Sequence, residues 1–446
     1  MRIHFIGIGG IGVSALAWYY LAQGWKVSGS DLAASEIIQD LKSAKVSIKI
    51  GHQSANLPDK TDLVVYSAAC AKNNPELKKA RVLKIPVLSY AEAIGELTKK
   101  YFTITVSGAH GKSTTTAMLA LMMIKAGLDP TVIIGTKLKE FGASNFRAGK
   151  SRYLVLEADE WNRSFLRYYP NILVLTNIDK EHLDTYKNLQ GVIKAFGDYF
   201  QNIVPGGKIV ANGKDKNIRQ ALNLKKIPAK VIFYNKGQWR LGIPGDYNKL
   251  NAEAAWQAGR LLGVPKQIAV EVLRKYRGSW RRAEPLELKR TGKEWQSHAL
   301  SLPKGFKFFS DYAHHPAEIK ASISGFKKMF PKKPLAIIFQ PHQMKRLNDL
   351  FRDFISGFKE VDVLALLPVY QVAGREFNKT NKAKDSKDLF AAIKKAGWPK
   401  QVFYLQEFKE SFNILKSHPG AVVVFMGAGD IDNEVRKYFI SKLLPM

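Results

Sequence analysis

Short apolar runs alternate with amphipathic stretches along most of the chain. The first runs are rich in the β-branched and aromatic residues that favour buried strands. They cover residues 3–8, 25–30, 46–50 and 63–66. Segments with helical periodicity lie between them, including residues 13–23 and 75–83. This alternation predicts a sheet of mostly parallel strands with helices on its faces.

The alternation restarts twice, at residue 102 and again at residue 306. The second series has apolar runs at residues 102–106, 153–156 and 172–175, and the third at 306–310, 335–339, 361–366 and 421–426. A chain of 446 residues suits about three domains. We therefore predict three doubly wound α/β domains. They are a Rossmann-like domain over 1–98, a P-loop-type domain over 99–278 and a second Rossmann-like domain over 279–446.

A glycine-rich turn joins the run at 102–106 to a helical segment at 114–125. A strand, a glycine turn and a helix N-terminus form a cradle in which backbone N–H groups face an anion. Lys112 can neutralise phosphate charge, and the hydroxyl of Ser113 can bind Mg²⁺. Val106 occupies the place of the first glycine in the usual nucleotide loop, so the match is to a shorter Gly-x-x-Gly-Lys-Ser form. The residues predicted to hold a nucleotide here are Gly108, His110, Gly111, Lys112, Ser113 and Thr114.

A second glycine motif, Gly-Ile-Gly-Gly-Ile-Gly, follows the first apolar run of the chain. Its position between a strand and a helix, with an acidic residue about 20 positions further on, is that of a Rossmann-type unit. Such a loop holds the diphosphate of a dinucleotide or of a nucleotide sugar, and the glycines do not distinguish the two. The residues predicted to lie at this site are Gly7, Gly9, Gly10, Gly12, Asp31 and Ser67.

Polar clusters follow two strands of the second series. Residues 157–160 read Glu-Ala-Asp-Glu, and residues 176–184 contain three acidic residues and His182. Carboxylates and a histidine at neighbouring strand ends, beside a phosphate loop, indicate a Mg²⁺-nucleotide site. Further along, Asn248 and Asn251 are three residues apart, so both side chains can face one ligand. Helix capping explains Asn248 equally well.

The composition adds a strong positive charge. The chain has 69 Lys and Arg against 38 Asp and Glu, a net charge of +31. Such a field attracts anions, including nucleotides, nucleotide sugars, nucleic acids and membrane surfaces. The basic residues are spread along the chain, and we see no helix-turn-helix, zinc-finger or RNA-recognition signature, so we expect no nucleic-acid partner.

The cysteine content and the uncharged run near the N-terminus bear on the cellular compartment. The single cysteine, Cys70, excludes an intrachain disulfide and is weakly indicative of a reducing compartment. The uncharged run at residues 5–23 contains four glycines, which weaken a membrane helix. We therefore expect a cytoplasmic protein with no membrane partner, and the oligomeric state stays open.

The whole chain resembles the Mur ligases, the ATP-dependent amide ligases of peptidoglycan precursor synthesis. The matching stretches occur in all three series and in the order of the family. They are GIGGIGVSALA, SGAHGKSTTT, EADEWNRSFL, TNIDKEHLDTY, IPGDYNKLNAEAA, RRAEPLEL, DYAHHPAEIKAS, FQPHQMKR and FMGAGD.

The resemblance implies a reaction. ATP would phosphorylate the carboxylate of UDP-N-acetylmuramate, and L-alanine would attack the acyl phosphate, with ATP and Mg²⁺ as cofactors. The nearest alternative is the related ligase that attaches murein tripeptide during cell-wall recycling. At GIGGIG, SFL and FQPH the chain is more similar to the branch that adds L-alanine.

The resemblance also implies roles for single residues. Lys112 would bind the transferring phosphate, and Ser113, Glu157 and His182 would hold Mg²⁺. Asn248 and Asn251 would contact the base of the nucleotide, and Arg282 and Asp311 would complete the ATP site on domain closure. The residues implied for the remaining substrate contacts are His314, His342 and Arg346.

Four positions depart from the family pattern. Tyr247 replaces a histidine, Glu181 an aspartate and Tyr90 an arginine. Gln343 replaces the first of two arginines that hold the carboxylate of the amino acid, and Arg346 retains the second. A glutamine donates a hydrogen bond but lacks the charge and the fork of a guanidinium. We therefore expect a weakened carboxylate clamp, in which glycine or L-serine could also be accepted.

Two hypotheses from other functional classes remain open. The first glycine motif alone suits an NAD-dependent oxidoreductase, but this leaves the Gly-Lys-Ser turn and the Glu157 and His182 pair unexplained. The charge of +31 suits a nucleic-acid-binding ATPase.

Overall fold

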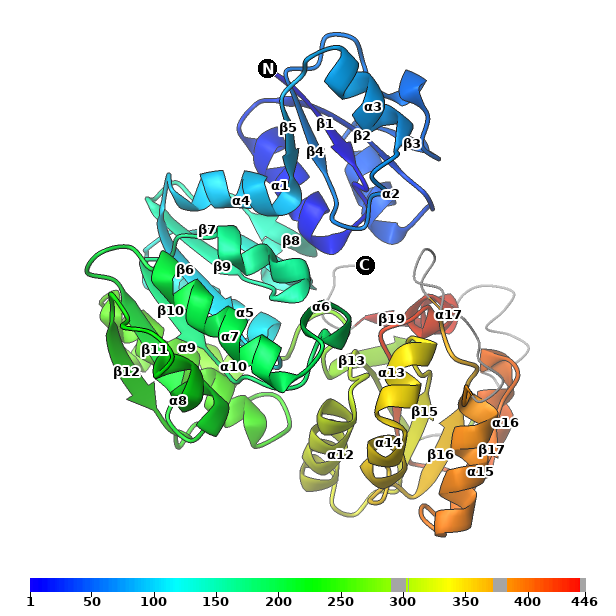
Figure 1. Cartoon of the computed structure of the whole chain (residues 1–446). Coiled ribbons are helices and arrows are strands. Elements are labelled where there is room, and N and C mark those ends of the chain that lie inside the picture. Colours follow the sequence, from blue (N-terminus) through cyan, green and yellow to red (C-terminus); the bar gives the residue numbers. More distant parts are fainter. Residues whose placement is uncertain (290–301, 304, 372–382, 442–446) are drawn as a thin grey trace. The chain divides into compact units, whose positions relative to one another are not determined.

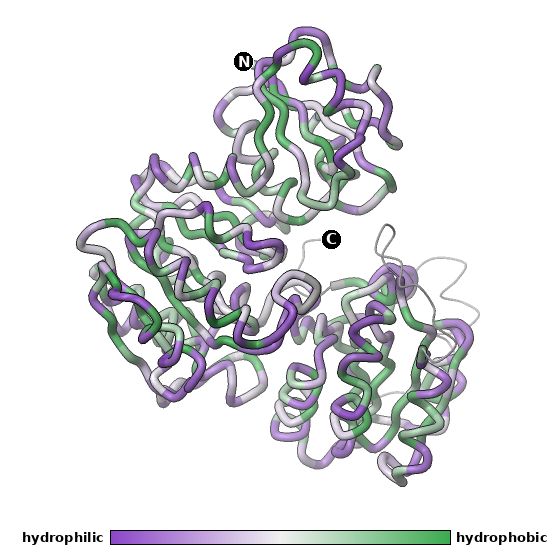
Figure 2. The backbone as a smooth tube through the Cα atoms, viewed as in Figure 1, coloured by the Kyte–Doolittle hydropathy of each residue, from purple (hydrophilic) through white to green (hydrophobic). Residues whose placement is uncertain are grey.

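The computed structural model describes residues 1–289, 302–303, 305–371 and 383–441, which form two compact units (Figure 1). The first unit comprises Met1–Arg240 and Lys249–Lys275. The second comprises Leu241–Asn248 and the described part of Tyr276–Met446. In both units the hydrophobic residues concentrate on the strands (Figure 2).

The first unit begins with a five-stranded sheet in which every neighbouring pair is parallel. The strands are β1 (Arg2–Ile6), β2 (Lys26–Asp31), β3 (Ser47–Ile50), β4 (Leu63–Tyr66) and β5 (Val87–Ser89), in the order β3-β2-β1-β4-β5. The helices are α1 (Ile11–Ala22), α2 (Glu36–Ser43), α3 (Pro75–Val82) and α4 (Tyr90–Thr98).

Alternate residues of β1 face opposite sides of this sheet. Ile3 and Phe5 pack in the apolar layer that contains residues of α1, α2 and α4. Ile6 packs in the layer that contains Leu77 of α3. His4 points to the same side as Ile6, so a polar side chain is buried under α3.

A seven-stranded sheet follows in the same unit. Its strands are β6 (Phe102–Ser107), β7 (Thr131–Leu138), β8 (Ser144–Arg147), β9 (Tyr153–Glu157), β10 (Ile172–Leu175), β11 (Lys208–Asn212) and β12 (Lys230–Tyr234). The order is β12-β11-β10-β6-β9-β7-β8, and β8 is antiparallel to β7. Because β6 lies between β10 and β9, the loops after these three parallel strands meet at one edge.

The helices that accompany this sheet are α5 (Lys112–Lys125), α6 (Leu183–Tyr186), α7 (Leu189–Tyr199), α8 (Lys216–Leu222), α9 (Tyr247–Leu261) and α10 (Lys266–Lys275). Helix α5 begins two residues before the sequence-based prediction, because Gly111 adopts a left-handed conformation at its N-cap and the helix starts directly after it.

The β7–β8 hairpin joins the two sheets of the first unit. The ammonium of buried Lys137 lies 2.7 Å from a carboxylate oxygen of Glu36 and 2.7 Å from one of Asp40, both on α2. Asn145 on β8 donates its side-chain N–H to the hydroxyl of Ser14 on α1 at 2.9 Å. These polar contacts bind the hairpin to the helices that cover the first sheet.

The second unit also contains a seven-stranded sheet. Its strands are β13 (Glu284–Leu288), β14 (Lys307–Asp311), β15 (Leu335–Phe339), β16 (Val363–Leu366), β17 (Gln401–Tyr404), β18 (Val422–Met426) and β19 (Phe439–Ser441). The order is β17-β16-β15-β18-β14-β13-β19, and β13 is antiparallel to both of its neighbours.

Helices cover both faces of this sheet. They are α12 (Pro316–Met329), α13 (Met344–Asp349), α14 (Phe351–Gly357), α15 (Ser386–Ala396), α16 (Ser411–Lys416) and α17 (Ile431–Tyr438). Residues of α12, α14 and α15 share one apolar layer with the sheet, and residues of α16 and α17 share the other.

The predicted α/β fold class is confirmed, with three sheets built from alternating strands and helices. The sequence pattern missed β5, β7, β8, β11, β12, β13, β17 and β19, of which β7, β11 and β13 have partner strands on both sides. The other five are short edge strands, which leave few positions for an apolar pattern to show.

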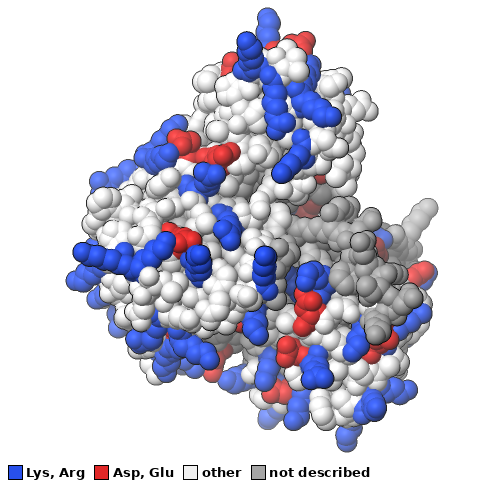
Figure 3. All heavy atoms as spheres, in the orientation of Figure 1, with Lys and Arg blue, Asp and Glu red and all other residues white. Residues whose placement is uncertain are grey.

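Lys and Arg side chains are distributed over the visible face of both units, with fewer Asp and Glu between them (Figure 3). This matches the spread of basic residues along the chain. Among the described residues, we find no helix with both the length and the apolar character needed to cross a membrane.

We expect Lys137→Met to lower the free energy of unfolding by about 1–3 kcal/mol, because Glu36 and Asp40 lose a charged partner. Urea denaturation followed by circular dichroism measures the change. Lys139→Met is the matched control, since Lys139 is exposed just after the same strand. An equal loss in the two variants would contradict a specific role for the Lys137 contacts.

Candidate functional site

The first glycine loop is closed by hydrogen bonds from its backbone. The N–H groups of Gly7 and Ile8 donate to the carbonyl of Ser30 at 2.8 and 3.1 Å. The N–H of Gly9 donates to the carboxylate of Asp31 at 2.8 Å. Gly7 has a φ of 80°, and a Cβ there would lie 2.8 Å from Cβ of Ser67. The structure therefore brings Gly7, Gly9, Asp31 and Ser67 together at the ends of β1, β2 and β4.

Tyr90 lies against the end of the same loop. A Cβ at Gly12 would lie 2.8 Å from the phenol oxygen of Tyr90, so a side chain at this position would displace the ring. Gly10 donates its N–H to the carbonyl of Gly7 at 3.3 Å. Burial raises the pKa of Tyr90, and the carboxylates of Asp159 and Glu157 raise it further, so the phenol is neutral at pH 7.

The second glycine loop leaves no room for side chains at two positions. Gly108 and Gly111 have φ values of 131° and 81°. A Cβ at Gly108 would overlap the hydroxyl of Thr176, and one at Gly111 would overlap the side-chain amide of Asn251. Glycine is therefore required at both positions, because φ is positive and because a Cβ would overlap a neighbouring side chain.

The backbone of His110 is fixed within this loop. Its N–H donates to the side-chain oxygen of Asn177 at 2.9 Å. Its carbonyl accepts from the hydroxyl of Thr176 at 2.7 Å and from the Asn177 side-chain amide at 2.8 Å. Residues after β10 thereby hold the loop that follows β6, while Ser113 and Thr114 lie in the first turn of α5.

Lys112 lies between the glycine loop and two carboxylates. Its ammonium is 2.9 Å from Glu160, 3.5 Å from Asp159 and 3.3 Å from the carbonyl of Ala109. The imidazole Nε2 of His182 is 3.7 Å from Glu160 and 3.8 Å from Asp159. A ligand atom from each of Asp159, Glu160 and His182 lies within 4.8 Å of the others.

The charged groups in this cluster shift one another's pKa values. Burial opposes the charge of Lys112, but Glu160 and Asp159 outweigh burial and raise its pKa. Partial burial opposes the charge of Asp159, whose side chain is 53% exposed, and Lys112 with His182 outweighs it and lowers the pKa of that carboxyl. Burial raises the pKa of Glu160 to about 7, an effect that Lys112 partly offsets. The cluster therefore contains a carboxyl poised to change protonation near neutral pH.

Glu157 is held apart from this cluster by its own partners. One of its oxygens accepts from the hydroxyl of Ser113 at 2.8 Å, and the other accepts from the N–H of Gly135 at 2.7 Å. Of the three metal ligands implied by the resemblance, Ser113 and Glu157 are thus in direct contact.

The resemblance does not imply Asp159 or Glu160 as metal ligands. Both belong to the polar run after β9 that the sequence pattern singled out. Only the structure shows that Glu160 is fully buried, with its carbonyl accepting from the phenol of Tyr186. His182, which the resemblance pairs with Glu157, lies beside Asp159 and Glu160.

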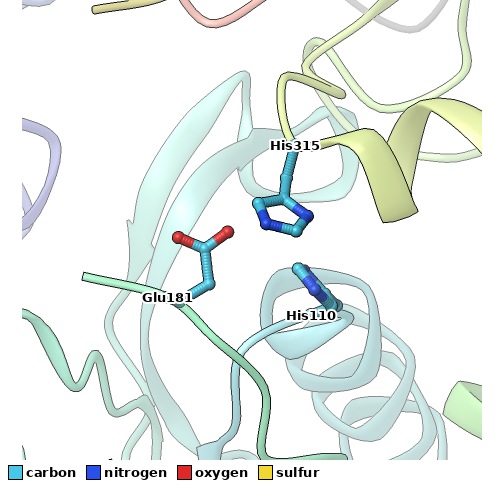
Figure 4. A group of neighbouring side chains, drawn as sticks. All are labelled: His110, Glu181 and His315. Carbon is cyan, nitrogen blue, oxygen red and sulfur yellow. The ribbon is translucent and has the colours of Figure 1, made fainter. Parts of the chain in front are cut away.

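His110 and Glu181 face each other from the loops after β6 and β10 (Figure 4). A ring nitrogen of His110 lies within 4.8 Å of a carboxylate oxygen of Glu181, so the departure from aspartate at position 181 keeps a carboxylate here. His315, also labelled in Figure 4, belongs to the second unit. There its ring accepts a hydrogen bond from the N–H of Ala317 at the start of α12.

The two asparagines of α9 have different surroundings. The side chain of Asn251 is buried next to Gly111. The side chain of Asn248 donates to the carbonyl of Pro244, and its own N–H donates to the carbonyl of Gly245 at 3.0 Å. Asn248 is the second residue of α9, and its side chain donates to the turn before the helix instead of accepting as an N-cap does, while Asn251 lies at the second glycine loop.

In the second unit, Asp311 and Arg282 lie near each other. Asp311 is the last residue of β14, and its carboxylate accepts from the hydroxyl of Ser322 and the N–H of Ala313. Burial raises the pKa of Asp311, while Ser322, Ala313 and Arg282 oppose that rise. The Arg282 guanidinium lies 5.4 Å from the ring centroid of Tyr312.

The loops after β14 and β15 bring His314, His342 and Arg346 together. The rings of His314 and His342 meet edge to face with centroids 5.7 Å apart, and Tyr370 stacks on His342 at 5.6 Å. A guanidinium nitrogen of Arg346 is 3.3 Å from Nδ1 of His342. Gln343 has a φ of 67°, and its N–H donates to the carbonyl of Tyr370 at 2.8 Å.

Three family models match the chain in succession. They are described as Mur ligase family, catalytic domain, at residues 2–102, Mur ligase middle domain at 106–256, and Mur ligase, glutamate ligase domain, at 297–429. A UDP-N-acetylmuramate–L-alanine ligase of Aquifex aeolicus is 36% identical, covering 96% of this chain and 95% of the relative. One of Caldanaerobacter subterraneus subsp. tengcongensis is 36% identical, covering 99% and 97%.

The chain belongs to the Mur ligase family. Mur ligases use ATP. The solved UDP-N-acetylmuramate–alanine ligase of Thermotoga maritima is similar with a TM-score of 0.78 and 25% identity, and 98% of each chain is covered. A murein peptide ligase of Psychrobacter arcticus shares the fold with a TM-score of 0.69 and 22% identity.

The Mur ligase matches cover most of the side chains described above, but not Arg282, which lies between the second and third matches. The first match contains the loop at residues 7–12, and the second contains Lys112, Glu157 and His182. The third contains Asp311 and Arg346. The two glycine loops, the cluster around Lys112 and the cluster around Arg346 therefore lie within the matched segments.

Proposed function

We propose that this Mur ligase joins L-alanine to the carboxylate of UDP-N-acetylmuramate, in the cytoplasmic synthesis of peptidoglycan precursors. One observation carries the proposal: the first unit has two glycine loops, each after a central strand of its own sheet. One suits the diphosphate of a UDP sugar and the other the phosphates of ATP. The names of the relatives that match nearly the whole chain support this choice of substrates.

The proposed reaction has two steps. The muramyl carboxylate attacks the γ-phosphorus of ATP, which forms an acyl phosphate and releases ADP. The amine of L-alanine then attacks the acyl carbon, a proton is lost, and inorganic phosphate leaves as the amide forms. Lys112 would neutralise charge on the transferring phosphoryl group, which needs alignment and positive charge more than covalent help.

Mg²⁺ is proposed as the metal, and the side chains present fit such an ion. The hydroxyl of Ser113 and the carboxylate of Glu157 are in contact, and the carboxylates of Asp159 and Glu160 lie beside His182. Oxygen donors predominate, as Mg²⁺ prefers. Ser113, Glu157 and His182 remain the proposed ligands, and Asp159 and Glu160 join them as candidates. When bound, the ion would supply charge neutralisation for the phosphates.

In the second unit, Arg282 and Asp311 are proposed nucleotide contacts, and the cluster of His314, His342 and Arg346 is proposed to bind the amino acid. The guanidinium of Arg346 suits a carboxylate, which it can bind with two hydrogen bonds. The stacked rings of His342 and Tyr370 would limit the space for the amino-acid side chain. Such a limit would favour L-alanine, glycine or L-serine over a tripeptide.

Phosphate release tests the reaction. We expect release only when ATP, UDP-N-acetylmuramate, Mg²⁺ and L-alanine are all present. Release with murein tripeptide in place of L-alanine would indicate the recycling ligase. Tight NADH binding without competition by the UDP sugar, or ATP hydrolysis stimulated by nucleic acid alone, would contradict the proposal.

We expect Lys112→Ala to reduce ligation about a hundredfold or more, because the transferring phosphate loses the cation beside the glycine loop. UDP-N-acetylmuramate binding, measured by calorimetry, should be retained because the two glycine loops serve different ligands. Lys125→Ala is the control, since Lys125 is an exposed residue at the other end of α5. Loss of UDP-sugar binding in a folded Lys112→Ala variant would argue against separate sites.

We expect Glu157→Ala to raise the Mg²⁺ concentration for half-maximal activity about tenfold, because a carboxylate that contacts Ser113 is removed. A Mg²⁺ titration of activity measures this shift, with exposed Glu140→Ala as control. Identical titrations for Glu157→Ala and the unsubstituted protein would remove Glu157 from the metal site.

Arg346→Ala should raise the KM for L-alanine about tenfold and leave the KM for ATP unchanged, because the carboxylate loses its charged partner. Gln343→Arg should lower the KM for L-alanine by restoring a second cation. Lys345→Ala is the control, since Lys345 pairs with Asp349 on the same helix at 2.6 Å. An unchanged KM in Arg346→Ala would place the carboxylate elsewhere.

A further inference from the structure

A buried carboxylate lies under the first glycine loop and has no part in the proposed chemistry. Glu76 is the second residue of α3, and its side chain is inaccessible to solvent. One of its oxygens is 2.7 Å from Nε2 of His4, and the other is 3.0 Å from Nδ1 of His52. The hydroxyl of Ser30 donates to both oxygens, at 2.8 and 2.9 Å. Glu76 thus joins three segments of the first sheet.

The hydroxyl of Ser30 connects this carboxylate to the glycine loop. The carbonyl of the same residue accepts the N–H groups of Gly7 and Ile8. A shift of Ser30 would therefore move the acceptor that fixes the first turn of the loop. Glu76 sets the position of Ser30 through its side chain, on the face of the sheet covered by α3.

His52 provides a second connection to the loop. It follows Gly51, whose N–H donates to the carbonyl of Asp31 at 2.8 Å. The carboxylate of Asp31 in turn accepts from the N–H of Gly9. Glu76 therefore braces the loop from two sides, through Ser30 at its start and through His52 and Asp31 at its middle.

The protonation of the network follows from its hydrogen bonds. An ionised carboxylate only accepts, so Ser30, His4 and His52 must all donate to it. His4 then carries a proton on Nε2 and His52 carries one on Nδ1. Burial opposes the charge of Glu76, but the hydrogen bonds from His4, Ser30 and His52 outweigh burial and lower its pKa.

We propose that Glu76 is a positioning residue for UDP-N-acetylmuramate, which it serves by holding Ser30 and His52 so that the loop at residues 7–12 keeps its diphosphate-binding shape. The inference rests on the proposed function, because it takes the ligand of this loop from there. Glu76 itself touches no substrate in this assignment.

Glu76→Gln tests the role with almost no change in volume. An amide donates at one of the two oxygen positions, so it faces a donor where the carboxylate accepted. We expect the Kd and KM for UDP-N-acetylmuramate to rise about tenfold. The kcat and the KM values for ATP and L-alanine should stay within about twofold, since Lys112 and Arg346 are untouched.

A spectroscopic readout separates positioning from simple loss of stability. In Glu76→Gln, the histidine that faces the new amide N–H must accept, so its proton moves to the other ring nitrogen. Two-dimensional ¹⁵N spectra of the imidazoles should show this tautomer change at His52 or His4. Glu96→Gln is the matched control, because Glu96 is an exposed residue that pairs with Lys99. It should change neither the spectra nor the UDP-sugar KM.

The binding measurements distinguish the positioning role of Glu76 from the proposed function. If the unsubstituted protein fails to bind UDP-N-acetylmuramate in calorimetry, the proposed function fails. If it binds and Glu76→Gln binds equally well, only the positioning role is overturned. Should Glu76→Gln not fold, Ser30→Ala removes the link from Glu76 to the start of the loop and leaves the contacts of Glu76 with His4 and His52 intact. A several-fold rise in the UDP-sugar KM supports the role, and an unchanged KM overturns it.

Discussion

Phosphate binding by backbone N–H groups requires a loop that approaches its neighbours too closely for side chains. Gly7 packs against Ser67, Gly108 against Thr176 and Gly111 against Asn251, and all three have positive φ. A Cβ at any of them would displace the neighbouring side chain or backbone. The residues packed against the two loops are therefore held at a distance that only glycine permits.

The first unit also contains two clusters in which charged side chains are paired. Lys112 lies beside Glu160 and Asp159, which support its charge, and Lys112 in turn favours the charged form of both carboxylates. Under the first loop, a buried carboxylate is likewise supported by two histidines and a serine. Buried charges are tolerated when they are paired and hydrogen-bonded. The net charge of +31 lies mostly on the surface instead, where it favours anionic substrates without defining a site.

Much of this arrangement could be predicted from local pattern. The apolar runs at 63–66, 172–175 and 335–339 coincide with β4, β10 and β15. Glycine motifs between strand and helix indicated both loops, because glycine at such turns has a direct steric reason. Edge strands such as β8 were missed, since a short strand paired on one side lacks a strong apolar period.

The sequence by itself determined the α/β class, the two glycine loops and the polar runs at the carboxyl ends of their strands, because these depend on residues close together in the chain. The tertiary structure alone decided which carboxylate meets which cation. Lys112 meets Glu160 and Asp159, while Ser113 meets Glu157, within one four-residue acidic run. It also decided that Glu76 lies beneath a loop some 70 residues earlier. Such contacts depend on strand order and helix packing, which bring distant residues together and leave no periodic trace in the sequence.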